Sequence, residues 1–189
     1  MKKFELTSEF VTFLGKKLFR IKALISFGNV KEGELGGYVE KEENLSNDGN
    51  AWVSGNARVS GNARVYGDAE VFGNARVFGN ASVYGNAWVF GNARVYGNAW
   101  VSGNAWVSGN ARVSGDADYA TVHGFGSEYR TTTFFRTKAG DIGVRCGCFY
   151  GTLEEFRAKV KETHGETKTA KEYLMVADLM EFRFSKEEA

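Results

Sequence analysis

The amino-acid sequence predicts a mainly β protein: a parallel β-helix of triangular coils, with a small β cap before it and an α+β cap after it. Two observations predict this fold. From Gly49 to Ser114 the chain repeats the unit Gly-(Asn or Asp)-Ala-x-Val-x eleven times, and the variable residues change in step with every third copy. A unit of six residues buries no core alone, so the copies must stack on one another.

Each unit reads as a short strand followed by a corner. The valine stands between two variable residues, as in Arg94-Val95-Tyr96. Because side chains alternate along a strand, the valine points inward and both of its neighbours point outward. We expect the glycine and the Asn or Asp that follows it to supply the positive φ angles that a corner needs.

The size of one coil follows from the residue before each valine. If three units, or eighteen residues, close a coil, residues that stack on one another from coil to coil are mostly of the same kind. If two units closed a coil, tryptophans would stack on arginines. The three columns are Arg58, Arg76, Arg94, Arg112; Trp52, Glu70, Trp88, Trp106; and Arg64, Ser82, Trp100, Asp118. The pattern predicts a three-sided coil, and four regular coils make a rod roughly 20 Å long.

The chain divides into three regions. Residues 1–35 read as short strands, with a hairpin-like segment around Gly15, and form an N-terminal β cap. Residues 36–121 form the β-helix, whose first coil is irregular although Val39 and Leu45 keep the six-residue spacing. Residues 122–189 form a C-terminal α+β domain of two strands and two helices. We expect it to cover the last coil, since an uncapped solenoid exposes unpaired strand edges.

The elements of the C-terminal region follow from local patterns. Residues 129–138 and 142–150 alternate like two strands. Thr152 stands three residues before a glutamate and predicts a capped helix to about Lys161. Thr169 has the same spacing to a glutamate and predicts a second helix through Leu179.

Several motifs carry a resemblance to known families. The repeats, such as Val-Tyr-Gly-Asn-Ala-Arg, resemble those of the hexapeptide-repeat superfamily of left-handed parallel β-helices. The entry region is most similar to YdcK-like β-solenoid proteins of phages and prophages, over roughly residues 1–120. The segments that carry this second similarity are Leu18-Phe19-Arg20-Ile21-Lys22-Ala23, Gly36-Gly37-Tyr38-Val39-Glu40 and Asn44-Leu45-Ser46. The resemblance implies a left-handed coil, a homotrimer and a phage protein.

Composition excludes several classes of protein. A net charge of +1 argues against a nucleic-acid binder, which is usually strongly basic. The start of the chain lacks the apolar run of a signal peptide, and no stretch is long enough to span a membrane. Two cysteines form no disulfide framework. We therefore expect a cytoplasmic protein, in the host bacterial cytoplasm if a phage encodes it.

The positions of the histidines bear on whether the protein is an enzyme. The superfamily resemblance implies acyltransferases that bind coenzyme A and use a histidine base. The rod has no histidine, and the two histidines of the chain are His123 and His164. His123 is the one candidate for a catalytic base, and we expect no enzyme and no cofactor.

A metal site is considered at Cys146 and Cys148. If both lie on one side of a strand, the two thiols could bind zinc together with His164 or His123. Two closely spaced cysteines without a second pair are a thin signal. Buried structural cysteines are the favoured interpretation, and no metal is expected.

The arginine column is the leading candidate for a binding site. Four like charges about 4.8 Å apart repel one another, which bound anions, acidic residues of a partner or ring stacking would offset. A solvated ladder of exposed arginines is the alternative. Aromatic residues interleave with the arginines, a combination that suits a nucleotide-like anion. The predicted ligand residues are Arg58, Arg76, Arg94, Arg112, Phe78 and Tyr96.

A second outward surface is unusually apolar. Phe72, Trp88, Phe90 and Trp106 cluster on it, and such a patch favours an interface. Cross-strand ring pairs that simply stabilise the sheet are the alternative. Self-association, most naturally as a trimer, is the preferred interpretation.

These observations favour a non-catalytic oligomeric β-helix that binds a small anionic ligand or a host protein. By analogy with phage biology, it would act as a counter-defence factor that sequesters a nucleotide signal. A coenzyme A-dependent acyltransferase and a structural component of the virion are the alternatives.

Overall fold

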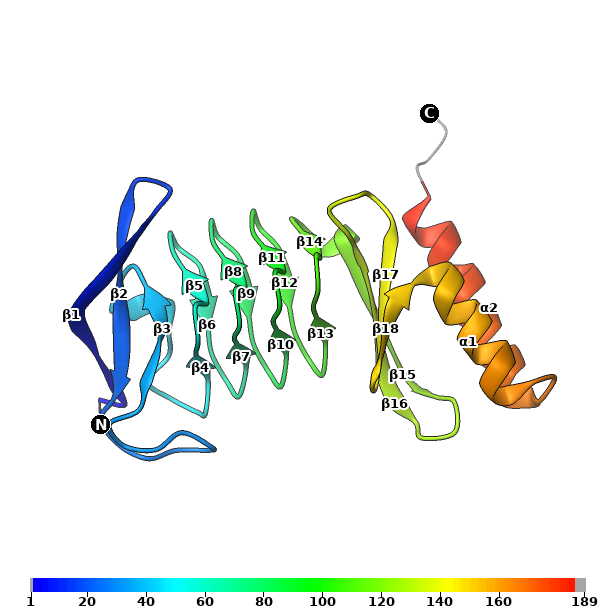
Figure 1. Cartoon of the computed structure of the whole chain (residues 1–189), viewed down its shortest axis with the longest axis horizontal. Coiled ribbons are helices and arrows are strands. Elements are labelled where there is room, and N and C mark those ends of the chain that lie inside the picture. Colours follow the sequence, from blue (N-terminus) through cyan, green and yellow to red (C-terminus); the bar gives the residue numbers. More distant parts are fainter. Residues whose placement is uncertain (1, 186–189) are drawn as a thin grey trace.

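The computed structural model describes residues 2–185. It shows an elongated β-solenoid with a strand hairpin at one end and two helices at the other (Figure 1). The rod consists of eleven two-residue strands, each made of a valine and the residue before it. They are β4 (Trp52–Val53), β5 (Arg58–Val59), β6 (Arg64–Val65), β7 (Glu70–Val71), β8 (Arg76–Val77), β9 (Ser82–Val83), β10 (Trp88–Val89), β11 (Arg94–Val95), β12 (Trp100–Val101), β13 (Trp106–Val107) and β14 (Arg112–Val113).

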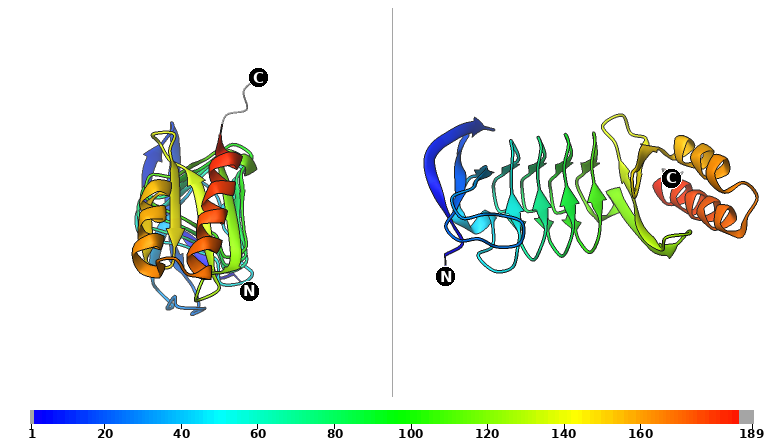
Figure 2. Two further views of the ribbon diagram at one scale, coloured as in Figure 1. Left: turned by 90° about the vertical axis from the view of Figure 1, so that its right-hand side faces the viewer. Right: turned by 60° about the horizontal axis from the view of Figure 1, so that its bottom comes forward.

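The strands form three parallel sheets, one on each side of the coil. Strands β5, β8, β11 and β14 make the arginine sheet, β4, β7, β10 and β13 the tryptophan sheet, and β6, β9 and β12 the third sheet. Arg58 pairs with Arg76, which lies eighteen residues further on, so the predicted coil of three units is confirmed. Figure 2 shows the successive coils stacked along the rod.

The interior of the rod is a column of small apolar side chains. The repeat valines and alanines from Ala51 to Val113 are fully buried. Backbone N–H groups of each coil donate to carbonyl groups of the next coil, as from Trp52 to Ala69 at 3.0 Å. Most backbone hydrogen bonds of a coil therefore go to its neighbours, while weaker ones close the corners within a coil, as from the Ala57 N–H to the Ser54 carbonyl at 3.2 Å.

The corners differ from the expectation in one respect. The glycine adopts a left-handed φ, for example 71° at Gly61, but no Asn or Asp of the repeats within residues 2–185 does so. The asparagines instead form ladders of side-chain hydrogen bonds along the rod. Asn62 donates to Asn80 at 3.1 Å, and Asn80 donates to Asn98 at 3.1 Å. The prediction of positive φ at the asparagine was wrong: the glycine alone supplies the left-handed residue, and the asparagine N–H joins the ladder between coils, as from Asn62 to the Gly79 carbonyl at 2.8 Å.

The N-terminal end is closed by a hairpin and an irregular coil. Strands β1 (Phe4–Phe13) and β2 (Lys16–Ala23) are antiparallel, and β3 (Leu35–Val39) joins β2 to the arginine sheet by pairing in parallel with β5. Val39 and Leu45 are buried in line with the repeat valines. The prediction of an irregular first coil is confirmed.

Side chains complete the hydrogen bonding at the ends of the rod. At the N-terminal end, where carbonyl groups face outward, the Asn44 amide of the short helix η1 (Glu42–Asn44) donates to the Ala63 carbonyl at 2.8 Å. At the C-terminal end, where N–H groups face outward, Asp116 of η2 (Asp116–Asp118) accepts from the Trp100 N–H at 2.9 Å. Side-chain donors therefore pair with free carbonyl groups at the N-terminal end, and side-chain acceptors pair with free N–H groups at the C-terminal end.

The C-terminal sheet has four strands where two were predicted. They are β15 (Tyr119–Phe125), β16 (Arg130–Arg136), β17 (Ile142–Cys146) and β18 (Phe149–Thr152), all antiparallel. The expected strand over 142–150 is interrupted because Gly147, at φ 56°, turns the chain back on itself. The segment after the last repeat also forms a strand, β15, which was not predicted.

Two helices pack side by side beyond this sheet (Figure 2). Helix α1 (Leu153–His164) has the predicted cap, in which the Thr152 hydroxyl accepts from the Glu155 N–H. Helix α2 (Lys168–Phe184) is longer than predicted and begins earlier. Its cap is Thr167, whose hydroxyl accepts from the Ala170 N–H, so the assignment of the cap to Thr169 was wrong. The sequence offers two threonines with the same capping propensity, and in the fold the first of them begins the helix.

Two adjacent phenylalanines of β16 separate two cores. Phe135 packs with the buried valines and alanines of the rod, whereas Phe134 packs with Phe156 and the other apolar residues of the helices. Both are fully buried. Because successive side chains point to opposite faces of a strand, one strand closes the rod and supports the helices at the same time.

Candidate functional site

The predicted arginine column forms one continuous row. Arg58, Arg76, Arg94 and Arg112 pair in register across β5, β8, β11 and β14, and all four are half-buried. Within residues 2–185, none of them forms an ion pair. Burial and the neighbouring guanidinium groups lower the pKa of Arg76 and of Arg112. The row is therefore a line of positive charge without acidic partners in the described part of the chain.

The N-terminal half of the row is covered by the β1–β2 hairpin. The guanidinium groups of Arg58 and Arg76 lie 5.6 Å and 5.2 Å from the centre of the Phe13 ring. Phe13 also meets Phe78 edge to face, at 6.0 Å between ring centres. This contact was not predictable from the repeat pattern, because Phe13 lies outside the repeats.

The C-terminal half of the row is open. Arg112 donates to backbone carbonyl groups, including that of Ala111 at 2.7 Å. Arg94 has no hydrogen bond from its guanidinium within residues 2–185. Beside it, Phe78 and Tyr96 stack with 5.2 Å between ring centres and 7° between their planes. The coil beyond Tyr96 places Ser114 at the same position, so the second face of the tyrosine ring meets only a small side chain.

The aromatic surface on the tryptophan sheet is a ladder of stacked rings. Phe72 stacks on Phe90 at 4.8 Å and Trp88 stacks on Trp106 at 5.0 Å, each within 4° of parallel. Arg145 of β17 lies over both Phe90 and Trp106, at 5.6 Å and 5.5 Å from the ring centres. Part of the predicted interface is thus covered by the protein's own C-terminal sheet, and Phe72 and Trp88 form the remainder.

His123 lies in a hollow between the rod and the C-terminal sheet. Its Nδ1 is 3.1 Å from the Thr131 hydroxyl, and its side chain is exposed. The hollow, of about 410 Å³, is also lined by Trp88, Trp106 and Arg130. The sequence placed His123 just past the last coil and could not show that it faces the tryptophans.

The two cysteines do not share one face of a strand, as the sequence had suggested. Cys146 ends β17 and accepts a hydrogen bond from the Thr132 hydroxyl, whereas Cys148 lies in the following turn and is exposed. The expectation of two buried cysteines was therefore wrong, because Cys148 is exposed and Cys146 is only partly buried. His164 packs against the Tyr173 ring at the far end of α1. These three side chains do not converge on one metal position.

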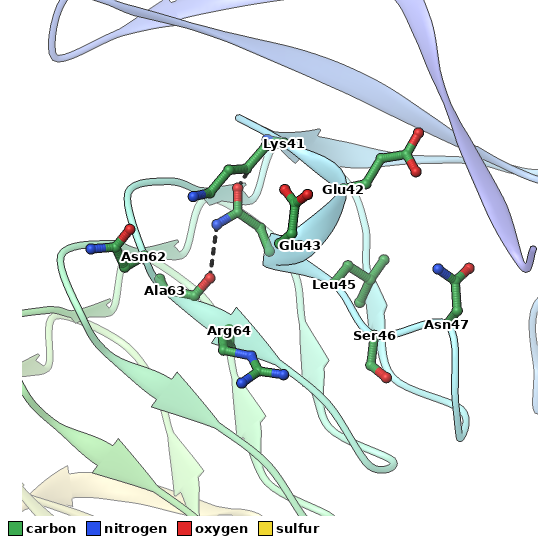
Figure 3. Close-up of a pocket in the computed structure, with 10 residues that line it drawn as sticks. Lys41, Glu42, Glu43, Leu45, Ser46, Asn47, Asn62, Ala63 and Arg64 are labelled. Carbon is green, nitrogen blue, oxygen red and sulfur yellow. Dashed lines mark hydrogen bonds between the residues drawn. The ribbon is translucent and has the colours of Figure 1, made fainter.

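A second hollow lies against η1, at the N-terminal end of the third sheet. Lys41, Glu43 and Arg64 border it, so its walls carry charges of both signs (Figure 3). The Asn44 amide of η1 donates to the carbonyl oxygens of Gly61 at 3.1 Å and Ala63 at 2.8 Å. The residues in the wall of this hollow thus mainly serve to close the first coil.

Fold and surface together define the class of protein: a capped parallel β-solenoid whose outward faces carry charged and aromatic ladders. Within this class, the repeats match the family model described as the YdcK Beta solenoid repeat, over residues 51–67, 57–71, 69–85, 87–103 and 93–109. The rod is therefore built from YdcK-type β-solenoid repeats, as the motifs predicted. No curated protein matches the chain in a sequence search. None of the helices within residues 2–185 combines the length and apolar character needed to cross a membrane.

Proposed function

We propose that the protein is a non-catalytic binding protein whose arginine sheet holds an anionic, nucleotide-like ligand. The observation that carries this proposal is the row of four half-buried arginines without an ion pair within residues 2–185. Guanidinium groups held side by side repel one another, and an anion that bridges them removes this repulsion. Their planar donors also suit the oxygens of a phosphate group.

The ligand would lie on the open part of the row. Arg94 and Arg112 would contact the phosphate groups, because Phe13 covers the other half. The base would stack on the free face of Tyr96, whose opposite face is already supported by Phe78. Base stacking on an aromatic side chain typically contributes about 1–3 kcal/mol.

Calorimetric titrations with adenosine monophosphate, adenosine and inorganic pyrophosphate test the proposal. Arg94→Ala should weaken binding of the monophosphate by about tenfold, because a charge-assisted hydrogen bond is lost. Tyr96→Ala should weaken the nucleotide but leave pyrophosphate unchanged. Arg64→Ala is the matched control, since Arg64 precedes a repeat valine on the third sheet and should have no effect.

Two results would count against the proposal. If none of the three compounds binds, the arginine sheet does not hold a small nucleotide-like anion. If Arg64→Ala weakens binding as much as Arg94→Ala, the effect comes from total charge and not from the row.

The wider biological role follows from the resemblance to phage proteins. Sequestration of a nucleotide signal would make the protein a counter-defence factor in the bacterial cytoplasm. The alternative partner is a host protein, whose acidic surface would bind the same row of arginines. A homotrimer through Phe72 and Trp88, the exposed part of the aromatic ladder, stays a prediction that native mass spectrometry tests directly.

An acyltransferase is the second candidate, because His123 faces a hollow. Its Nε2 is available as a base, since Nδ1 lies beside the Thr131 hydroxyl. This function requires coenzyme A binding and loss of acetyl transfer in His123→Ala. A role in the virion is the remaining alternative, and incorporation of the protein into purified particles would distinguish it.

A further inference from the structure

A separate hollow lies at the opposite, N-terminal end of the tryptophan sheet. Its volume is about 470 Å³, and the loop around Asn29 forms one wall while the rod forms the other. Trp52, Glu70 and Trp88 of three successive coils line the rod side. Glu34 and Asp68 stand at its edge. Two indole rings and three carboxyl groups therefore border one space.

Glu70 is the unusual residue of this surface. It is the one acidic residue that precedes a repeat valine between Trp52 and Arg112, and it stands between two tryptophans in the column. Its carboxylate has no ion pair and no hydrogen bond within residues 2–185. Burial alone raises its pKa. A desolvated carboxylate without a partner is a cost to the folded protein that a bound cation would offset.

The other two carboxyl groups are already engaged to different degrees. Asp68 accepts from the Asn50 amide at 2.8 Å. Burial lowers the pKa of Lys3, and the negative charge of Asp68 opposes this by favouring the charged form of the Lys3 ammonium. Glu34 accepts from the Lys31 N–H at 3.1 Å. Glu70 is therefore the carboxylate on which a ligand would depend, and the other two add negative potential.

Trp52 forms a largely buried part of the wall of the hollow. Its side chain is only 5% exposed, and its indole Nε1 is buried without a hydrogen bond. Buried indole N–H groups normally have an acceptor. This N–H is closed off from solvent, so the hollow offers a ligand the unpaired Glu70 carboxylate and aromatic walls.

The chemistry of the walls selects the kind of cation. Within residues 2–185 no group of three or more His, Cys, Asp or Glu side chains is placed to hold a metal ion. Calcium also requires six to eight oxygen ligands, which indole rings do not provide. Aromatic walls with a carboxylate are the usual site for an alkylated ammonium group.

We propose that the hollow between Trp52, Glu70 and Trp88 binds a small organic cation with an alkylated ammonium group. The Glu70 carboxylate neutralises its charge, and the indole rings contact its alkyl groups. This site is distinct from the arginine sheet, and its ligand has the opposite charge.

Tetramethylammonium chloride is the probe for a nuclear magnetic resonance titration of the four indole N–H signals, with sodium chloride at equal concentration as the control. The signals of Trp52 and Trp88 should shift and saturate. Trp100, exposed on the third sheet, should not respond. Glu70→Gln should weaken binding by about tenfold, because the counter-charge is lost while the shape is kept.

Three variants complete the test. Trp88→Ala should weaken binding as much as Glu70→Gln, whereas Trp100→Ala and Arg94→Ala should leave it unchanged. Unchanged binding in Arg94→Ala separates this site from the nucleotide site proposed above. The proposal is overturned if the tetramethylammonium shifts equal those from sodium chloride, or if Glu70→Gln and Trp88→Ala bind the probe as tightly as the natural protein.

Discussion

The ammonium nitrogen of Lys3 lies 2.9 Å from the carbonyl oxygen of Ala51, inside the N-terminal end of the rod. It also donates to the Gly49 carbonyl at 3.2 Å and lies over the Phe27 ring. These two carbonyl groups would accept from a preceding coil if the rod continued. One buried lysine therefore ends the solenoid at this corner by replacing the missing backbone donors.

Lys3→Met should lower the free energy of unfolding by about 1–3 kcal/mol, because buried carbonyl groups lose their partner. Lys2→Met is the matched control, since Lys2 is exposed and makes a surface ion pair with Glu42. Urea denaturation of both variants measures the difference. Equal stability of the two variants would contradict the role assigned to Lys3.

The same lysine should make stability depend on pH. Burial lowers the pKa of Lys3 from 10.5 to about 8 in the folded protein. Between these two values the unfolded chain holds a proton that the folded protein has released, so the Lys3 contribution to the free energy of unfolding increases from pH 8 to 10.5. Denaturation over this range should show a steeper rise for the natural protein than for Lys3→Met. Parallel curves would show that Lys3 has an ordinary pKa.

Gly61→Ala should destabilise the rod by about 1–2 kcal/mol, because its φ of 71° disfavours any residue with a Cβ. The added Cβ would also lie 2.9 Å from the carbonyl oxygen of Gly79 in the next coil. Gly115→Ala is the control, since Gly115 is extended and no atom lies within 4 Å of its added Cβ. Thermal unfolding of both variants distinguishes strain at the corner from a general effect of alanine.

Phe135→Ala should cost about 3–5 kcal/mol, as is typical for loss of a buried phenylalanine. Hydrogen exchange should then rise first in the last coil, around Val107 and Val113, because β16, which carries Phe135, packs against β13 and β14 there. Phe134→Ala should instead increase exchange in α1 and α2. The same exchange pattern in both variants would show that the rod and the helices unfold as one unit.

Thr167→Ala should cost about 1 kcal/mol, because helix α2 loses its N-terminal cap. Thr169→Ala should have a much smaller effect, although the sequence pattern had favoured this residue. Denaturation of the two variants side by side tests the assignment. A larger effect of Thr169→Ala would restore the prediction made from the capping-box spacing.

Local patterns were sufficient for the rod but not for the surfaces around it. The eighteen-residue spacing predicted that Arg58 pairs with Arg76 and that the repeat valines are buried. Contacts between the caps and the rod carry no such period. The position of Phe13 over Arg76 and of Arg145 over Trp106 decides which part of each ladder is open, and both residues lie outside the repeats.

The candidate sites were likewise predictable where they lie on the repeats, but not where the caps contribute to them. The sequence identified the arginine row and the Phe78–Tyr96 pair because each is a column of the repeat. It also contained Glu70 as a single acidic residue between tryptophans, but the loop around Asn29 that turns this position into a hollow became apparent only from the fold.

The sequence by itself determined a three-sided parallel β-solenoid, its eighteen-residue coil and the column to which each outward side chain belongs. These features depend on a short repeat, and every coil repeats the same contacts. The tertiary structure decided how the rod ends and which faces stay open. Lys3 and Phe135 close the two ends by contacts across the fold, and such contacts depend on packing in three dimensions and not on any local period.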